Sequence, residues 1–353
     1  MQGGETPRTS CALHILKLPE ELVEAILEFV DVRGLIRCAL AGNALLKRLP
    51  RARLSALLVD LKLCTLQRSF SEAYDTTQIS SGAIRDFSKF CHLAEKGVFP
   101  LLSRTLLRDH GLSPDGTNPL ITCLHRTPSM CSAVKELAFV ACDFGPNDVR
   151  RFASSLGAGA LPCMIDLTFN GCPFRANDLR LLIEAIMGDK QVRPRLQNLE
   201  LINAQLNDEC MRAFEVAAGS KRPSALIRAS LSYNDIGPVG IGHLVASMKR
   251  GAFPNLHILR LTSNRVGDEG LQKLVFPIVD ESVSLEHLSL TRNRVGDEGL
   301  ADFCRTIYET RAAPPPPLKR IDFRKNTIGD LGKREFAALV ESGGLPFLDD
   351  YHF

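Results

Sequence analysis

The sequence predicts an α/β solenoid, with parallel strands along its concave side and helices along its convex side. The first observation is a near-copy, in which LHILRLTSNRVGDEGL at 256–271 returns as LEHLSLTRNRVGDEGL at 285–300. A period of about 30 residues indicates stacked repeats rather than a globular enzyme core. The other two observations are apolar residues two apart at the start of each unit, and apolar residues three and four apart at its end.

The first Leu of the copy defines position 1 of a frame that extends in both directions. Repeats then begin at Val134, Met164, Leu196, Leu226, Leu256, Leu285 and Leu318, with a stub at Leu345. Positions 4 and 6 are apolar throughout, which predicts a short strand. Positions 16, 19 and 23 are apolar except at Lys333, which predicts a helix. Neither half buries its apolar face alone, so the seven units are expected to stack.

The turn between strand and helix also follows a pattern. Position 9 is Asn234, Asn264, Asn293 and Asn326 in the later repeats and Cys142 and Cys172 in the first two. An inward Asn is costly unless both ends of its amide are bonded, so we expect a ladder that satisfies turn backbone in adjacent repeats. Position 12 is usually Gly and position 13 usually Asp or Pro, which are typical of helix starts, where a carboxylate caps free amides.

These positions together resemble the leucine-rich repeat family, and within it the helix-bearing ribonuclease-inhibitor type with the pattern LxxLxLxxNxhGDxGh. The resemblance covers residues 134–344. It implies a horseshoe-like solenoid that binds partners on its surface. Cys at position 9 occurs in the cysteine-containing subtype of the family.

Residues 13–50 predict a small helical module. Pro19 and the acidic residues after it favour a helix start, and later apolar residues recur at helical spacing. The LPxEL opening, the pair Ile26 and Leu27, and the step from Asp31 to Arg37 resemble an F-box, although the usual Trp is missing. The resemblance implies docking to a Skp-type linker through Leu18, Pro19, Leu22, Ile26, Leu27 and Leu35. The alternative is a plain helical cap over the first repeat.

The remaining segments are less informative. Residues 1–12 are expected to form a disordered tail, and residues 51–133 a helical linker and N-terminal cap. Within the linker, helices are expected at 82–96 and 98–110, and a degenerate strand at 58–63. Residues 345–353 are expected to seal the C-terminal end as a truncated strand, with Leu345 and Leu348 at positions 1 and 4.

Composition sets bounds on the function. A net charge of +3 over 353 residues is too small to indicate nucleic-acid binding. The polar N-terminus lacks the apolar core of a signal peptide, and no apolar run reaches membrane length. Eleven cysteines without a C-x-x-C pair favour a reducing compartment, cytoplasmic or nuclear. We find no catalytic constellation, no histidine spacing for a metal and no cofactor motif, and we expect a monomer outside its complex.

Function is therefore expected on the surface. Positions 3 and 5 should face the concave side, with positions 7, 8 and 10 along its rim. The first three repeats place Glu136, Asp166 and Glu200 there, whereas later repeats place cations and one aromatic residue there. The candidate partner-binding residues are Arg228, Tyr233, Arg260, Arg265, His287, Arg292, Arg294, Arg320, Arg324 and Lys325.

This basic half predicts an acidic or phosphorylated protein partner, with arginines as bidentate anchors. Nucleic acid is disfavoured because no aromatic residues are interleaved for stacking. We therefore expect a non-enzymatic adaptor that selects substrates for a cullin-type (SCF-like) ubiquitin ligase. Two alternatives stay open, a structural scaffold in a cytoskeletal or flagellar assembly and a RanGAP-like GTPase regulator.

Overall fold

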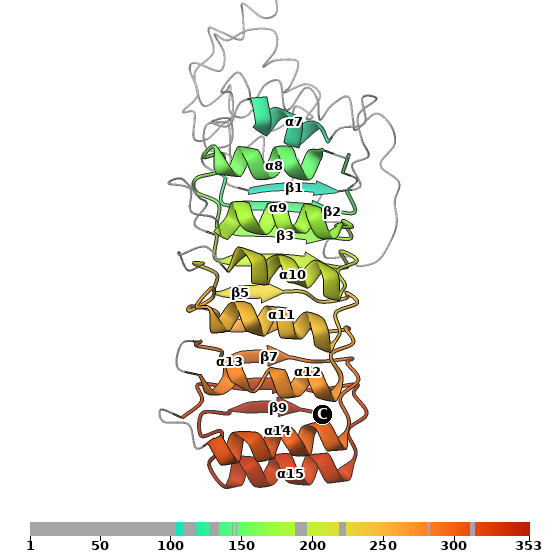
Figure 1. Cartoon of the computed structure of the whole chain (residues 1–353), viewed down its shortest axis with the longest axis vertical. Coiled ribbons are helices and arrows are strands. Elements are labelled where there is room, and N and C mark those ends of the chain that lie inside the picture. The colour runs from blue at the N-terminus through green and yellow to red at the C-terminus, as the bar shows by residue number, and fades with distance from the viewer. Residues whose placement is uncertain are drawn as a thin grey trace, which may run out of the picture.

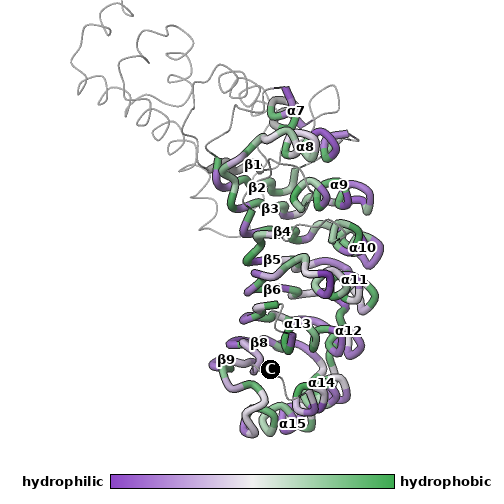
Figure 2. Tube along the Cα trace, turned by 60° about the vertical axis from the view of Figure 1, so that its left-hand side comes forward, coloured by the Kyte–Doolittle hydropathy of each residue, from purple (hydrophilic) through white to green (hydrophobic). Residues whose placement is uncertain are grey.

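The computed structural model describes residues 104–108, 118–126, 134–142, 144–145, 147–187, 196–218, 224–280, 283–310 and 315–353. In this part of the chain, nine strands form one parallel sheet in sequence order. Helices follow the strands and cover one side of the sheet (Figure 1). Turned by 60°, the molecule is a stack with the strands along one side and the helices along the other (Figure 2). The fold is the predicted α/β solenoid.

The strands are short, and each occupies the start of a repeat. They are β1 (Arg104–Arg108), β2 (Glu136–Val140), β3 (Asp166–Asn170), β4 (Asn198–Ile202), β5 (Arg228–Ser230), β6 (Ile258–Arg260), β7 (His287–Ser289), β8 (Arg320–Asp322) and β9 (Asp350–His352). Positions 4 and 6 point into the core as predicted: Leu137 and Phe139 are 2% and 0% exposed, and Leu288 and Leu290 are 1% and 0% exposed.

The helices form the outer layer. They are α7 (Pro119–Arg126), α8 (Asp148–Gly157), α9 (Ala176–Met187), α10 (Asp208–Ala217), α11 (Pro238–Lys249), α12 (Gly267–Lys273), α13 (Phe276–Val279), α14 (Asp297–Thr310) and α15 (Asp330–Glu341). The fifth repeat carries two short helices, α12 and α13, because Pro277 lies where a single helix would continue. Side chains at positions 16, 19 and 23 fill the space between the layers, as Leu300, Phe303 and Ile307 do from α14.

The predicted helix at 98–110 is wrong, because Arg104–Arg108 is a strand, β1, in a segment expected to be a helical linker and cap. It pairs in parallel with β2, with Thr105 opposite Leu137. The sequence LLSRTLL carries leucines at spacings that suit either element, and the neighbouring strand edge, which satisfies its backbone, decides the outcome. With α7, this strand makes one more strand-and-helix unit than the seven repeats predicted.

The predicted register of the C-terminal strand is also wrong by three residues. Tyr351 lies opposite Ile321 in the sheet, so Tyr351 and not Leu348 occupies position 4. The aromatic end of the chain then covers the last repeat, with the ring of Phe353 stacked 5.9 Å from that of Phe323. Packing of the aromatic side chains against the last helix therefore determines the register of this strand, rather than the spacing of its leucines.

The asparagine ladder is confirmed. Asn293 is 6% exposed, and its Nδ2 donates to the carbonyls of Leu261 and Leu290 at 2.9 and 3.0 Å. Its Oδ1 accepts from the backbone N–H of Val266 at 3.1 Å. Asn234, Asn264 and Asn326 repeat this arrangement. Each amide therefore ties its own turn to the turn of the preceding repeat.

The aspartates at position 13 cap the helix of the following repeat rather than their own. Oδ1 of Asp297 accepts from Gly329 N at 2.7 Å and from Gly332 N at 2.9 Å, both at the start of α15. Asp208 does the same for Gly237 and Gly240. A Cβ at position 332 would lie 2.7 Å from that carboxylate oxygen, so only glycine allows the approach. The GDxG motif is therefore a clamp between consecutive repeats.

The other predictions lie outside the described residues. They are the tail at 1–12, the strand at 58–63, the helix at 82–96 and the F-box-like module at 13–50 with its six linker-binding residues.

Candidate functional site

The concave face is built by the outward positions of the strands, which the register aligns into rows across the sheet. The row at position 3 runs Asp166, Asn198, Arg228, Ile258, His287, Arg320 and Asp350. The row at position 5 runs Thr168, Glu200, Ser230, Arg260, Ser289, Asp322 and His352. Neighbouring members of a row are one strand spacing apart, about 4.8 Å.

Carboxylates and amides mark the N-terminal rows, whereas cations dominate from β5 onward. Glu136 and Asp166 are on β2 and β3, and Asp166 accepts a hydrogen bond from Asn198. Glu200 accepts from Thr168 at 3.3 Å. These acidic groups therefore engage neighbours within their own half of the sheet.

Three of the ten candidate residues have their charge offset by an aspartate. Arg320 pairs with Asp350 at 2.5 Å. Arg324 contacts Asp322 through both Nε and an outer nitrogen, at 2.6 Å for the closer contact. Arg265 pairs with Asp235. The compensation of Arg320 could not be predicted, because Asp350 joins the row only through the shifted register of β9.

Five candidate cations have no ion-pair partner among the residues that the structure describes. Arg260, Arg292, Arg294 and Lys325 are exposed, and Arg228 is half-buried with its Nε buried and without a hydrogen-bond partner there. Unpaired cations on one face attract anions and cost little to bring into contact with a carboxylate or phosphate. The net positive charge of the face therefore rests on these five.

Position 8 of the turn has a distinctive backbone. Tyr233, Ser263, Arg292 and Lys325 all have positive φ, from 55° to 60°. This left-handed conformation is uncommon for residues with a side chain. It recurs because the turn leaves the strand at the same angle in every repeat, and it sends these side chains out in parallel. Tyr233 is 52% exposed.

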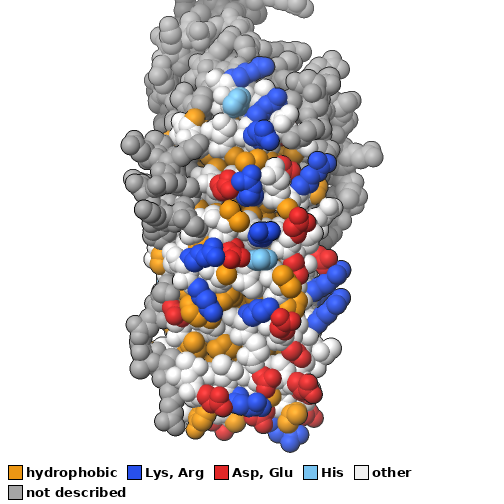
Figure 3. All heavy atoms as spheres, viewed as in Figure 1, with side chains coloured by type: hydrophobic (Ala, Val, Ile, Leu, Met, Phe, Trp, Pro, Cys, Tyr) orange, Lys and Arg blue, Asp and Glu red, His pale blue; other side chains and the backbone are white. Residues whose placement is uncertain are grey.

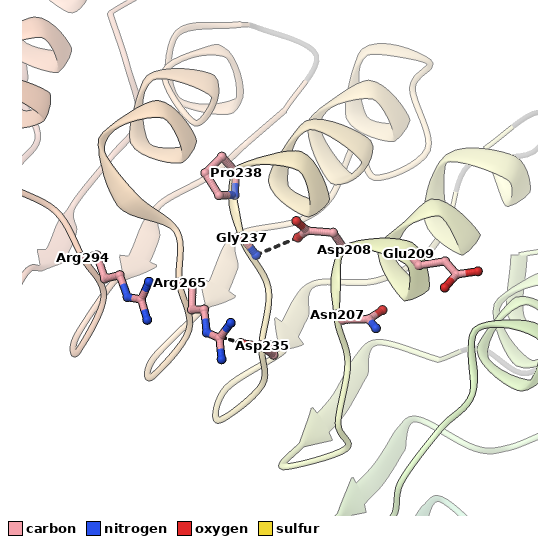
Figure 4. Close-up of a pocket in the computed structure, with 8 residues that line it drawn as sticks. All are labelled: Asn207, Asp208, Glu209, Asp235, Gly237, Pro238, Arg265 and Arg294. Atoms are coloured by element: carbon pink, nitrogen blue, oxygen red, sulfur yellow. Dashed lines mark hydrogen bonds and ion pairs between the residues drawn. The ribbon is translucent and has the colours of Figure 1, made fainter.

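Position 10 lies further round the rim, away from the sheet. Arg265 and Arg294 line a shallow pocket of about 400 Å³ with Asn207, Asp208, Glu209, Asp235, Gly237 and Pro238 (Figure 4). Asp208 is already bonded to Gly237 N, and Asp235 to Arg265. The pocket thus combines paired groups with one unpaired cation, Arg294, which lies two residues after Arg292.

The surroundings of two titratable groups on the concave face shift their pKa values. Burial lowers the pKa of His287 below its ordinary value, and although the carboxylate of Glu286 opposes this, the cations Arg320, Lys319 and Arg260 act with burial. Its imidazole is therefore neutral at pH 7. Burial alone would raise the pKa of Asp322, but hydrogen bonds from Arg324 outweigh it and hold that pKa below its usual range.

Hydroxyl groups between the cations were not among the predicted site residues. Thr262 Oγ1 lies 2.9 Å from Ser289 Oγ, which is 3.5 Å from Thr291 Oγ1. Their small size leaves the long cationic side chains standing above the floor of the sheet. Serine or threonine fills position 7 in all three repeats from β5 to β7 and position 5 in two of them, and this pattern is the signal that could have identified them.

The opposite, helical side differs in character. Lys and Arg side chains alternate with Asp and Glu over the helices (Figure 3). Many form ion pairs, such as Arg250 with Glu215 at 2.9 Å and Arg305 with Asp302 at 3.1 Å. A mixed, self-compensated surface has no preference for one sign of partner.

Comparison with known proteins bears on the repeats. The family model described as "Leucine Rich repeat" matches residues 254–275 and 281–304. Both stretches are leucine-rich repeats. They contain β6, β7 and the turns with Ser263 and Arg292, and the surrounding strand-and-helix units continue the same pattern. Leucine-rich repeats are commonly protein-binding surfaces, so a role in protein–protein interaction follows.

Other comparisons add little. An internalin from Listeria monocytogenes is 13% identical over 76% of this chain and 94% of its own, with a TM-score of 0.24. That superposition is loose and bears on no property of this chain. No curated protein matches the sequence.

Two kinds of feature are absent from the described residues. These residues contain no helix long and apolar enough to cross a bilayer. No group of three or more His, Cys, Asp or Glu side chains in these ranges could hold a metal ion. Among the described cysteines, burial raises the pKa of Cys304 to about 12.

Proposed function

We propose that the protein is a non-enzymatic adaptor that holds an acidic segment of a partner protein on the C-terminal half of its concave face. The observation that carries this proposal is a set of unpaired, mostly exposed cations, with Arg228 and Arg260 on the strands and Arg292, Arg294 and Lys325 in the turns beside them. The sheet provides a surface long enough for an interface of ordinary size, about 800 Å² per partner.

A charge-reversal experiment tests this face. The variant Arg260→Glu, Arg292→Glu, Lys325→Glu replaces three unpaired cations, while the control Arg212→Glu, Arg250→Glu, Arg305→Glu makes the same change in net charge on the helical side. Binding of a degenerate pool of fluorescent acidic peptides should weaken by at least about tenfold in the first variant, because charge-assisted hydrogen bonds are lost. Equal weakening in both variants would mean a nonspecific charge effect and would refute the proposal.

The larger role that we propose is substrate selection for a cullin-type ubiquitin ligase. It is supported by the F-box-like sequence at 13–50, whose Leu18, Pro19, Leu22, Ile26, Leu27 and Leu35 would pack against a Skp-type linker. Full-length protein should co-purify with that linker, and Leu22→Asp with Leu27→Asp should abolish co-purification because buried apolar contacts are replaced by charge.

If the wild-type chain retains no linker, the scaffold role in a cytoskeletal or flagellar assembly is favoured instead. Acceleration of GTP hydrolysis by a Ran-type GTPase would favour the RanGAP-like role. In either case the peptide-binding experiment still tests the concave face independently.

A further inference from the structure

Four consecutive turns form a ridge along one border of the concave face. This turn ridge consists of Tyr233, Ser263, Arg292 and Lys325, all at position 8 and all with positive φ. Because their backbones share one conformation and one register, their side chains project in parallel, about 4.8 Å apart from turn to turn. The ridge therefore presents an aromatic ring at one end and two cations at the other.

Hydrogen bonds hold the ridge rigid. The backbone N–H of Tyr233 donates to Thr262 O at 2.7 Å, that of Ser263 to Thr291 O at 2.8 Å, and that of Arg292 to Arg324 O at 2.8 Å. The buried asparagine at position 9 fixes each turn from the other side. A surface that is already ordered loses little entropy when a ligand binds.

One end of the ridge concentrates positive charge. Arg292 and Lys325 occupy position 8 of consecutive turns, are exposed, and have no ion-pair partner in the described ranges. Asp322, three residues before Lys325, is already held by Arg324 at 2.6 Å. Two uncompensated cations on adjacent turns repel one another, and an anion of more than one charge between them removes that repulsion.

The middle and far end of the ridge differ from this cationic end. Ser263 Oγ is buried, so this turn offers no exposed polar group and separates the cationic end from the aromatic one. Tyr233 offers an exposed aromatic ring two turns from Arg292. An apolar side chain of a ligand would pack on that ring.

We propose that the turn ridge binds an extended segment carrying a phosphorylated serine or threonine, with an apolar side chain three or four residues from it. This inference rests on the proposed function and specifies its ligand. The phosphoryl group lies between Arg292 and Lys325, because a tetrahedral group with about two negative charges accepts from more donors than a carboxylate does. The apolar side chain lies on Tyr233.

The distance between the phosphoryl group and the apolar side chain of the ligand follows from the stacking of the turns. Tyr233 is two turn spacings from Arg292 and three from Lys325, which is about 10 to 14 Å. An extended chain advances about 3.3 Å per residue, so that distance corresponds to three or four residues. The geometry therefore specifies a sequence motif as well as a modification.

Fluorescence anisotropy on the full chain tests the phosphoryl site. The probes are three degenerate peptide pools with phosphoserine, glutamate or serine at a fixed central position. The phosphoserine pool should bind about tenfold or more tightly than the glutamate pool, and Arg292→Gln should remove most of that difference. The matched control Arg305→Gln, at an exposed arginine of α14, should leave all three pools unchanged.

Pools with leucine fixed at one position at a time test the spacing. Leucine three or four residues from phosphoserine should strengthen binding, and Tyr233→Ala should abolish this preference while keeping the phosphoserine preference. Equal binding of phosphoserine and serine pools, or no leucine preference at that distance, would overturn the inference. If glutamate binds as tightly as phosphoserine and charge reversal weakens both, only this inference fails. If charge reversal weakens neither pool, the proposed function fails with it.

Discussion

The early and late repeats form the same turn between strand and helix, but they stabilise it with different side chains. In the units of β2 and β3, position 9 is cysteine and position 8 is Ala141 or Gly171. In the units of β5 to β8, position 9 is asparagine, and position 8 includes Tyr233, Arg292 and Lys325. Cys172 Sγ approaches Cys142 N at 3.4 Å, a weak contact beside the bonds of each asparagine amide. The stronger ladder occurs where the turns carry long, exposed side chains.

Aromatic packing occurs at both ends of the stack. Phe139 and Phe169 stack at 5.0 Å under the early repeats, and Phe323 and Phe353 stack at 5.9 Å under the last one. The late repeats rely on the asparagine ladder and the aspartate clamp between helices. We infer that polar bonding fixes the turns that present the partner-binding residues.

The largest effect is expected from removing one rung of the ladder. Asn293→Ala removes one of the two amide donors to each of the Leu261 and Leu290 carbonyls, and it leaves the buried N–H of Val266 without its acceptor. The free energy of unfolding should fall by about 3 kcal/mol, measured by urea denaturation. A loss below about 1 kcal/mol would mean that water replaces the amide and that the ladder is not a main support.

Next in size is the clamp between helices. Asp297→Ala removes the acceptor of Gly329 N and Gly332 N and should lower the free energy of unfolding by about 2 kcal/mol. The neighbouring exposed residue provides the control, since Glu298→Ala should change stability by less than about 0.5 kcal/mol. Equal losses in both variants would indicate a general helix-dipole effect instead of a clamp.

A smaller effect is expected in the early repeats. Cys172→Ala should cost about 1 kcal/mol, because the sulfur contributes packing volume and long, weak contacts such as those to Cys142 N, Phe139 O and Asn170 O. Thermal melts of Cys172→Ala and Asn293→Ala, side by side, measure the contrast directly. If the cysteine variant loses as much as the asparagine variant, the two kinds of turn are equally dependent on position 9.

The smallest effect concerns pH. The pKa of His287 is lowered in the folded chain, so the unfolded chain binds more protons, and the contribution of this residue to stability is complete above pH 6.5 and declines as pH falls. His287→Gln should reduce the difference in stability between pH 7 and pH 5 by well under about 1 kcal/mol. An increase in that difference would show that the imidazole is protonated in the folded chain.

Much of the candidate site could be predicted because it depends on repeat position. The frame that begins at Leu256 and Leu285 correctly placed Arg260 on the concave side and Asn293 inside the turn. Which arginines have their charge offset by an aspartate could not be predicted in the same way. Whether Arg320 is free depends on Asp350 of the next strand, and the leucine pattern of the stub placed that strand three residues out of register.

By itself, the sequence determined the repeat period, the positions whose side chains point into the core, and the stacking of the repeats in chain order. These follow from the spacing of apolar residues, because neither the strand nor the helix of one repeat can bury its apolar face alone. Tertiary structure decided what depends on neighbours. It made Arg104–Arg108 a strand by offering a sheet edge, and it directed each aspartate clamp to the following helix. It also selected which cations stay unpaired, because an ion pair requires two side chains to meet, and that meeting is a property of the stacked repeats.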